Sequence, residues 1–376
     1  MPPIFSIVMR RFADWLPIAL GIALISTLAG LQWHRTVRGQ NDFAALYAGA
    51  TLAGTPDLYS RSANEALIQS TTGGIMKSVM YTRPPFYAVL LKPLASLPYL
   101  VAYGIFCCLS IASILWFVIR FSKECEALPL CASFSIPVAA FLPQGQDAPL
   151  LLMFTGASIL LTRRRRDFLA GAVLSLCAIK FHLFLLLPLL LLVKKRWRIL
   201  AGAAAGTATL ALIGVAGAGT HALAGYAAVL RDPWINFSTE MMPNLHGLAA
   251  GLTRGAAGPM VDAGMACATT AVFLWISQKS DNYEFLFGLS LLCSLLISYH
   301  SGISDLILLL PVLVLMAGSS ADKPLRISLV ILLTPIPYFT GLGINLMIPA
   351  LMLVVLALAA LSVASLPRRA VPAFIS

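Results

Sequence analysis

Short clusters of basic residues separate long apolar runs from one end of this chain to the other. A helix needs about 20 apolar residues to cross a hydrocarbon core roughly 30 Å thick, and runs near that length recur. Of the 376 residues, 59% are hydrophobic and only 11% are charged, whereas a soluble domain carries about 25% charged residues. We therefore predict an all-α polytopic membrane protein, with residues 1–376 forming a single integral membrane domain.

The expected membrane topology accounts for the net charge of +11. Seven short clusters hold 17 of the 26 Lys and Arg residues: Arg10-Arg11, Arg120 with Lys123, Arg163 to Arg166, Lys194 to Arg198, Lys279, Lys323 with Arg326, and Arg368-Arg369. Short basic loops favour the cytoplasmic side of a membrane, so we expect all seven clusters there. The nine other basic residues, among them Lys77 and Arg254, fall in nearly neutral outer loops. The charge therefore needs no nucleic-acid partner.

The interval between Arg166 and Lys194 predicts an unusual element. It contains 27 residues, almost all apolar, and both flanking basic clusters should face the cytoplasm. A single span would place one cluster outside, so we expect a hairpin of two half-length helices with its tip at 180–182. Helices this short stay in a membrane only where protein or water surrounds the tip, which should therefore line a cavity. The alternative is one long tilted helix with a snorkelling Lys180.

The remaining apolar runs predict about 12 membrane segments with both chain ends in the cytoplasm. Their approximate bounds are 15–33, 98–119, 127–142, 148–162, 168–179, 183–193, 199–219, 260–277, 285–299, 304–317, 327–340 and 346–366. Two long outer segments, 34–97 and 220–259, should carry the functional site. Within the first, the proline-rich stretch 84–97 is expected to be an interfacial or re-entrant helix.

The polar residues that need an explanation all map to the outer face. They are Asp42, Arg83, the run Gln144 to Asp147, Lys180, His182, Arg231-Asp232, Asn244, His246, His300 and Asp305. Ordinary structural roles are open for several of them: a solvated loop aspartate, a tight loop, a local ion pair and a helix-end histidine. Trp33 and Trp234 are expected in the interfacial aromatic belt. The seven cysteines show no metal-ligand spacing with histidine, and no metal site is expected.

Taken in order, these residues resemble glycosyltransferase family 87, the mannosyltransferase-like enzymes of the C-type membrane glycosyltransferase fold. The similarity covers about residues 1–320. It is carried by Asp42-Phe43 with Tyr47, Gly54 and Leu58-Tyr59, by Tyr81 to Pro85 with Pro93-Leu94, by Gln144-Gly145-Gln146, by Arg163 to Asp167, by Ile179-Lys180, by Asn244 to Gly247 and by His300 to Asp305. One departure follows Lys180, where Phe181-His182 stands in place of an expected nearby proline.

The resemblance implies inverting transfer of a hexose, with mannose as the family's sugar, from a polyprenyl-phosphate donor and without a cofactor or a required metal. Asp42 is the expected catalytic base. A cation attracts the leaving phosphate more strongly as the phosphate gains negative charge. Lys180, Arg83 and His300 are therefore the candidate phosphate ligands. The candidate substrate-binding residues are Tyr47, Gln144, Gln146, His182, Asn244, His246 and Asp305.

The implied partners are the lipid-linked donor, a lipid or glycan acceptor and membrane lipid. The expected location is a bacterial inner membrane, with the site on the periplasmic face and the isoprenoid chain near the helices that start at Pro98 and Met260. A transporter or flippase for a lipid-linked sugar or organic anion is the alternative, because broken helices and buried charge also mark transporters. A non-catalytic scaffold would leave Asp42 and Lys180 unexplained.

Overall fold

The computed structural model describes residues 3–74, 80–233, 239–253, 257–319, 322–339 and 343–365, with side chains from residue 19 onward except at 28, 257 and 319. Every regular element in these ranges is a helix, which confirms the all-α prediction for the described part of the chain. Lys77, Trp234, Arg254 and the cluster Arg368-Arg369 lie outside the described residues.

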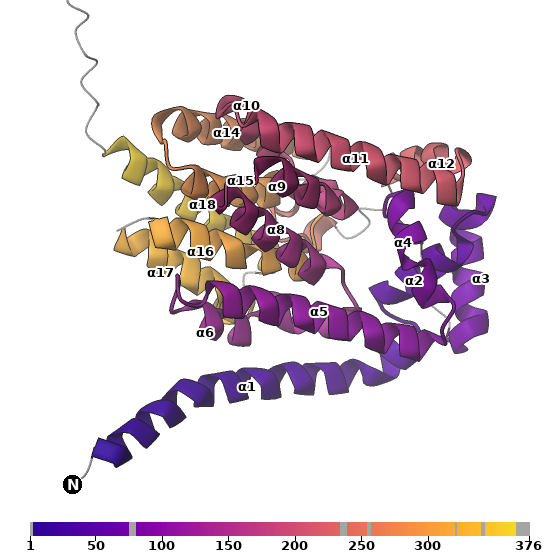
Figure 1. Cartoon of the computed structure of the whole chain (residues 1–376), viewed down its shortest axis with the longest axis horizontal. Coiled ribbons are helices and arrows are strands. Elements are labelled where there is room, and N and C mark those ends of the chain that lie inside the picture. The colour runs from indigo at the N-terminus through magenta and orange to yellow at the C-terminus, as the bar shows by residue number, and fades with distance from the viewer. Residues whose placement is uncertain are drawn as a thin grey trace, which may run out of the picture.

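The N-terminal part places one long helix beside a group of short ones. Helix α1 (Pro3–Val37) runs along one side of the molecule in Figure 1 and contains the predicted segment 15–33. The predicted outer segment 34–97 then folds into α2 (Asp42–Leu52), η1 (Pro56–Tyr59), α3 (Arg61–Thr72) and α4 (Pro85–Ala95). Helix α4 begins at a proline, whose missing N–H costs nothing in the first turn.

Five stretches are long and apolar enough to cross a membrane: α5 (Tyr99–Phe121), Asp167–Phe184, α11 (Trp197–Ala218), Gly258–Lys279 within α14 (Ala257–Lys279), and α18 (Ile344–Ala364). Shorter apolar helices are α4, α8 (Ala148–Arg163), α15 (Tyr283–Ile297) and the stretch Ile303–Gly318. The described residues therefore support a membrane protein, and the figure of twelve spans stays a prediction.

Two of the predicted segments are broken by proline. The segment 127–142 is divided into α6 (Leu128–Phe134) and α7 (Ile136–Gln144). A helix continuous through Pro137 would lose a backbone hydrogen bond, and its ring would clash with the carbonyl four residues earlier. The segment 327–340 is likewise replaced by α17 (Lys323–Leu333) and η6 (Ile336–Tyr338), because Thr334 adopts the extended backbone favoured before Pro335.

The predicted hairpin is confirmed. Helix α9 (Asp167–Leu174) leads into η2 (Ser175–Phe184), where Lys180 has non-helical backbone angles, and α10 (Leu186–Val193) returns. The two ends of the hairpin meet, since Arg196 Nη2 lies 3.6 Å from Asp167 Oδ1. Both basic turns therefore share one end of the molecule, which we call the basic end. Lys180 lies at the opposite turn of the hairpin, midway along the segment.

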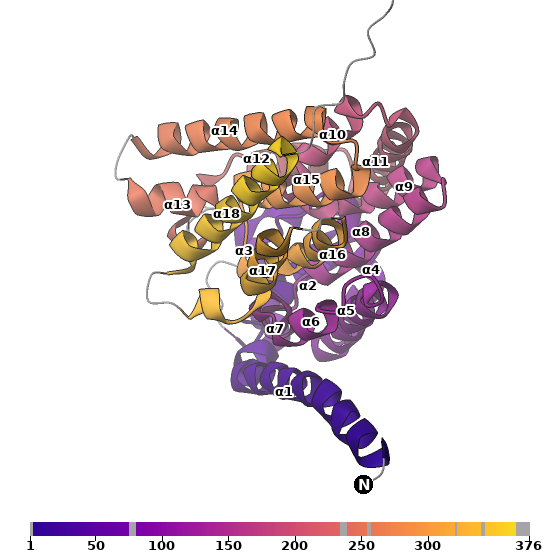
Figure 2. The ribbon, with the colours of Figure 1, turned by 90° about the vertical axis from the view of Figure 1, so that its left-hand side faces the viewer.

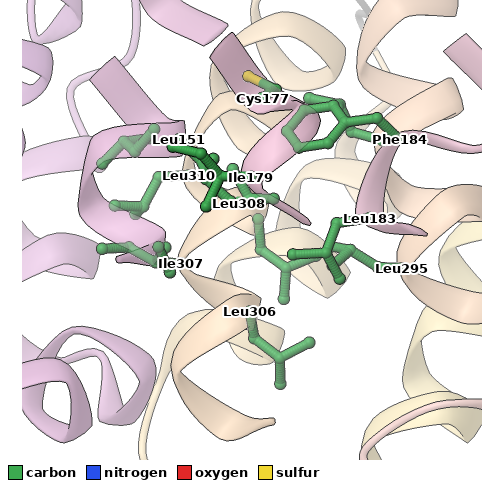
Figure 3. Close-up of a cluster of buried hydrophobic side chains, with 14 of the residues drawn as sticks. Leu151, Cys177, Ile179, Leu183, Phe184, Leu295, Leu306, Ile307, Leu308 and Leu310 are labelled. Atoms are coloured by element: carbon green, nitrogen blue, oxygen red, sulfur yellow. The ribbon is translucent and has the colours of Figure 1, made fainter. Parts of the chain in front are cut away.

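The core is centred on α15, in which every residue from Phe285 to Leu296 is buried. The adjoining η5 (Ile303–Leu308) and α16 (Leu309–Ser319) are also largely buried. Figure 3 shows Ile179 and Leu183 of η2 close to Leu308 and Leu295, so the hairpin tip rests on this core. Helices α12 (His221–Val229) and α13 (Leu245–Leu252), with η4 (Thr239–Met241), complete the described elements, and α13 packs with α14 and α18 in Figure 2.

Candidate functional site

Asp42 is fixed at the first turn of α2. The preceding residue, Asn41, caps the helix by accepting a hydrogen bond from the Ala44 N–H at 3.1 Å, and the same oxygen accepts from the Tyr99 hydroxyl at 2.8 Å. These contacts tie the start of α2 to α5. The partial positive charge of a helix N-terminus stabilises a carboxylate placed there. Asp42 itself is exposed, although its neighbours Asn41 and Phe43 are buried.

The turn between α7 and α8 reaches this carboxylate because it contains a glycine. Gly145 has φ +62°, and a Cβ at this position would lie only 2.5 Å from the Cβ of Phe43. Both its conformation and its close approach to α2 therefore require glycine. The next residue, Gln146, donates an amide hydrogen bond to Asp42 Oδ2 and accepts one from Lys180 Nζ at 2.8 Å. Gln146 thus links Asp42 to the hairpin tip.

Lys180 is 2% exposed and is surrounded by acceptors. Its Nζ lies 2.8 Å from Gln146 Oε1, 2.9 Å from Asp147 Oδ1 and 2.6 Å from Asp305 Oδ1. An ammonium group has three N–H donors, so these three acceptors can use all of them. The kink in η2 therefore places a fully bonded cation between the start of α8 and the start of η5.

Arg83 approaches Asp147 from the segment just before α4. Its Nε lies 2.7 Å from Asp147 Oδ2, its Nη2 lies 3.4 Å from Asp147 Oδ1, and its Nη1 donates to the Thr82 hydroxyl at 3.1 Å. The Tyr59 hydroxyl donates to the Arg83 carbonyl at 2.8 Å and holds the backbone. A guanidinium has five N–H donors, so two remain without a partner among the described residues. The Arg83 side chain is 14% exposed, which leaves it in reach of a ligand.

Arg83, Asp147, Lys180 and Asp305 form a group that we call the ionic cluster. Its formal charges sum to zero, and Asp42 adds one negative charge above it. Burial opposes ionisation of Asp147, but Arg83 and Lys180 outweigh burial and hold the pKa of this carboxyl well below its usual range. For Asp42 the balance is reversed: although its side chain reaches the surface, the protein atoms packed around it remove part of its solvation and raise its pKa, and Lys180 and Arg83 counter this effect only in part. Asp42 is therefore the better proton acceptor of the two.

Aromatic and imidazole rings border the ionic cluster. The His182 ring centroid lies 4.9 Å from that of Tyr299 and 6.0 Å from that of His300. Burial lowers the pKa of His300 to about 4, so its imidazole is neutral at pH 7. His182 is 6% exposed, and its Nε2 has no hydrogen-bond partner among the described residues. Among the described residues, His182 therefore has one ring nitrogen available to hydrogen-bond a ligand.

The other predicted site residues have different surroundings. The Tyr47 hydroxyl donates to the Leu97 carbonyl at 2.9 Å, between α4 and α5. Asn244 caps α13 and donates to the Ser298 carbonyl at 2.7 Å, whereas His246 Nδ1 lies 2.7 Å from Asp262 Oδ2. Gln144 is half-buried at the end of α7. Substrate roles for these four residues stay predictions, and the structure gives three of them contacts within the fold.

Asp147 is the central residue that the sequence analysis placed on the outer face but did not assign to the site. It is fully buried, and it accepts from both Arg83 and Lys180. The signal that could have identified it is chemical, because two cations predicted at one buried site require nearby carboxylates. Asp262 was missed for a simpler reason: it lies within an apolar helix, and nothing in the sequence pairs it with His246.

Comparison with known proteins gives one match. The model of glycosyltransferase family 87 matches residues 81–301, a range that includes Arg83, Gln146, Asp147, Lys180 and His300. A search of the curated proteins and of the solved structures finds no match.

Proposed function

Since the chain belongs to glycosyltransferase family 87, we propose that it is an inverting transferase that moves a hexose from a polyprenyl-phosphate donor to a lipid or glycan acceptor. Mannose is the proposed sugar, and the non-cytoplasmic face of the membrane is the proposed location of the site. One observation carries the proposal: an exposed carboxylate, Asp42, stands directly above a buried ionic cluster and is hydrogen-bonded to it through Gln146.

Asp42 is the proposed general base, which takes the proton from the acceptor hydroxyl as it attacks the sugar. The two other acids nearby suit this role poorly. Asp147 and Asp305 are almost completely buried, and each is paired with one or both cations. Asp42 is exposed, and its raised pKa increases its affinity for a proton. Gln146 holds one oxygen of Asp42 in place.

Arg83 is the proposed direct ligand of the donor phosphate. Two of its N–H groups have no partner among the described residues, and a guanidinium binds phosphate oxygens in a two-point geometry. Lys180 lies beneath it with its three donors occupied, so we propose that it acts on the phosphate through its charge and through the groups it orders. His300, whose imidazole is neutral at pH 7, is the third proposed phosphate ligand. As the leaving phosphate gains charge, these interactions strengthen, which lowers the barrier. Metal-independent transfer remains part of the proposal.

The test is transfer of radiolabelled sugar from a polyprenyl-phosphate donor into membrane lipid or glycan by the wild type and by Asp42→Asn. The variant keeps the size of the side chain but cannot accept the proton. A positioned base contributes about 10²–10⁴-fold, so transfer should nearly vanish while donor binding to the purified protein survives. Asp57→Asn is the matched control, because Asp57 is also exposed and lies in the same outer segment. Near-normal transfer by Asp42→Asn would reject Asp42 as the base, and a wild type that moves labelled lipid across vesicles without forming product would favour a transporter.

A further inference from the structure

A groove of about 270 Å³ with an almost wholly apolar lining lies beside the ionic cluster. It is bounded by the start of α4, the middle of η2, the middle of α11 and part of α12. Helix α12 follows the end of α11 and lies above α4 in Figure 1. The lining residues that matter here are Pro84, Phe181, Thr207, Ala211, Gly214 and Tyr226.

Two chain neighbours and one ring contact place the groove next to Arg83 and Lys180. Pro84 follows Arg83 in the chain, and Phe181 follows Lys180. The ring contact is made by Tyr226, whose ring centroid lies 5.9 Å from that of Tyr59, the residue that bonds to the Arg83 carbonyl. A molecule lying in the groove would therefore end at the side of the ionic cluster that Arg83 occupies.

The groove also opens to the surface of a membrane-spanning helix. Thr207 and Ala211 are exposed on α11, which is one of the five candidate spans. From Thr207 to Gly214 the helix advances seven residues, or about 10 Å. Small side chains leave this path open, and at Gly214 a Cβ would lie 3.0 Å from the Phe86 nitrogen. The groove therefore runs from the site along a lipid-facing helix.

We propose that this groove binds the first isoprene units of the polyprenyl-phosphate donor, an inference that rests on the proposed function. In such a donor the chain is bonded to the phosphate itself, so the chain must begin where the phosphate is held. The cations meet that requirement, whereas α2, which carries Asp42, contributes no residue to the lining. This argues for the donor chain over an acyl chain of the acceptor. Neither α5 nor α14 lines the groove, so the position differs from that expected near Pro98 and Met260.

The experiment compares Ala211→Phe, which fills the groove, with Ala216→Phe as a matched control. Ala216 is exposed on the same helix and does not line the groove. Transfer is measured against donor concentration with a full-length polyprenyl-phosphate sugar and with a short, water-soluble donor that carries a methyl group on the phosphate in place of the isoprenoid chain. Hydrophobic pockets discriminate by roughly 10-fold or more when their shape changes, so Ala211→Phe should raise the KM for the long donor by at least that factor. The short donor should be used within about twofold of the wild-type rate, and Ala216→Phe should match the wild type with both donors.

Three results would overturn the groove assignment: equal losses with the long and short donors, equal losses in the two variants, or a rise in KM for the acceptor in place of the donor. A binding readout separates this inference from the proposed function. A polyprenyl phosphate with a diazirine on its second isoprene unit and without a sugar should crosslink to wild-type peptides containing Phe181 or Ala211, and Ala211→Phe should reduce the yield. Crosslinks that map only outside the groove would refute the site whether or not the protein transfers sugar. A wild type that crosslinks at Phe181 but transfers no sugar would uphold the groove and reject the transferase.

Discussion

Replacing Lys180 with methionine should destabilise the fold as well as stop transfer. Methionine keeps much of the length of the side chain but removes the ammonium group that lies 2.6 Å from Asp305. The two side chains are 2% and 3% exposed, so water cannot solvate the carboxylate left behind. Asp147 keeps its bond to Arg83, and the cost therefore falls mainly on Asp305. Breaking a buried ion pair in this way costs about 3–5 kcal/mol.

A second variant shows whether the lost partner is the cause. In Lys180→Met/Asp305→Asn the orphaned charge is gone, so the double variant should be more stable than the sum of the two single losses predicts. Contacting residues show coupling energies of about 0.5–3 kcal/mol, and the upper part of that range is expected for this pair. Arg61→Met is the control, because the Arg61–Asp232 pair is 40% and 36% exposed and such pairs contribute about 0–1 kcal/mol.

The assay is the free energy of unfolding in mixed detergent micelles, measured together with sugar transfer for each variant. The double variant should recover stability without recovering transfer, because Gln146 still lacks the lysine that orients it. A loss of unfolding free energy below about 1 kcal/mol in Lys180→Met would refute this prediction, because a buried carboxylate that has lost its cation destabilises the fold by more than that. Strict additivity of the two single losses would refute it equally.

Three further outcomes are expected. Transfer should fall as the pH drops through the pKa of Asp42, because the base must be ionised. The midpoint of this fall, measured in a pH–rate profile, should lie above the value of about 4 for an ordinary aspartate. Gly145→Ala should destabilise the fold by about 1–3 kcal/mol and reduce transfer, because the new Cβ would collide with Phe43 at a residue with positive φ. Thermal melts and transfer assays measure the two effects, and unchanged values would contradict the close approach. Cysteines at Arg165 and Lys195 should react with an impermeant reagent from the same side of the membrane, and opposite-side labelling would contradict the hairpin.

The hairpin could be predicted from the positions of two basic clusters together with the length of the apolar run between them. Two basic clusters 27 residues apart cannot both lie in the cytoplasm if one helix crosses the membrane between them. The kink at Lys180 and the contact between Arg196 and Asp167 bear out this reasoning. The breaks at Ser135 and Thr334 were missed for a related reason. Average hydropathy over a segment is high whether or not proline interrupts its backbone hydrogen bonds, so apolar length alone overestimates continuous helices.

The sequence could predict which types of residue lie at the candidate site, but not which acids form ion pairs with its cations. Asp42, Arg83 and Lys180 stand out in the sequence because charge is costly beside apolar segments. Their partners come from turns far apart in the chain: Asp147 lies 64 residues from Arg83, and Asp305 lies 125 residues from Lys180. Sequence spacing carries no information about such contacts. It therefore could not show that the cations are already neutralised by carboxylates.

Under the proposed function, that neutralisation determines how the ionic cluster acts on the donor phosphate. A cation without a partner would attract the donor strongly in its ground state, and uniform attraction does not accelerate the chemical step. In the ionic cluster Asp147 and Asp305 balance Arg83 and Lys180. The net charge is therefore zero, while two N–H groups of Arg83 have no partner in the described part of the chain. Hydrogen bonds from a fixed guanidinium strengthen as the leaving oxygen gains charge, and the fold has already placed them. Under the proposed function, the two buried acids prevent strong ground-state binding, while Asp42, which lies outside the ionic cluster, remains available to take a proton.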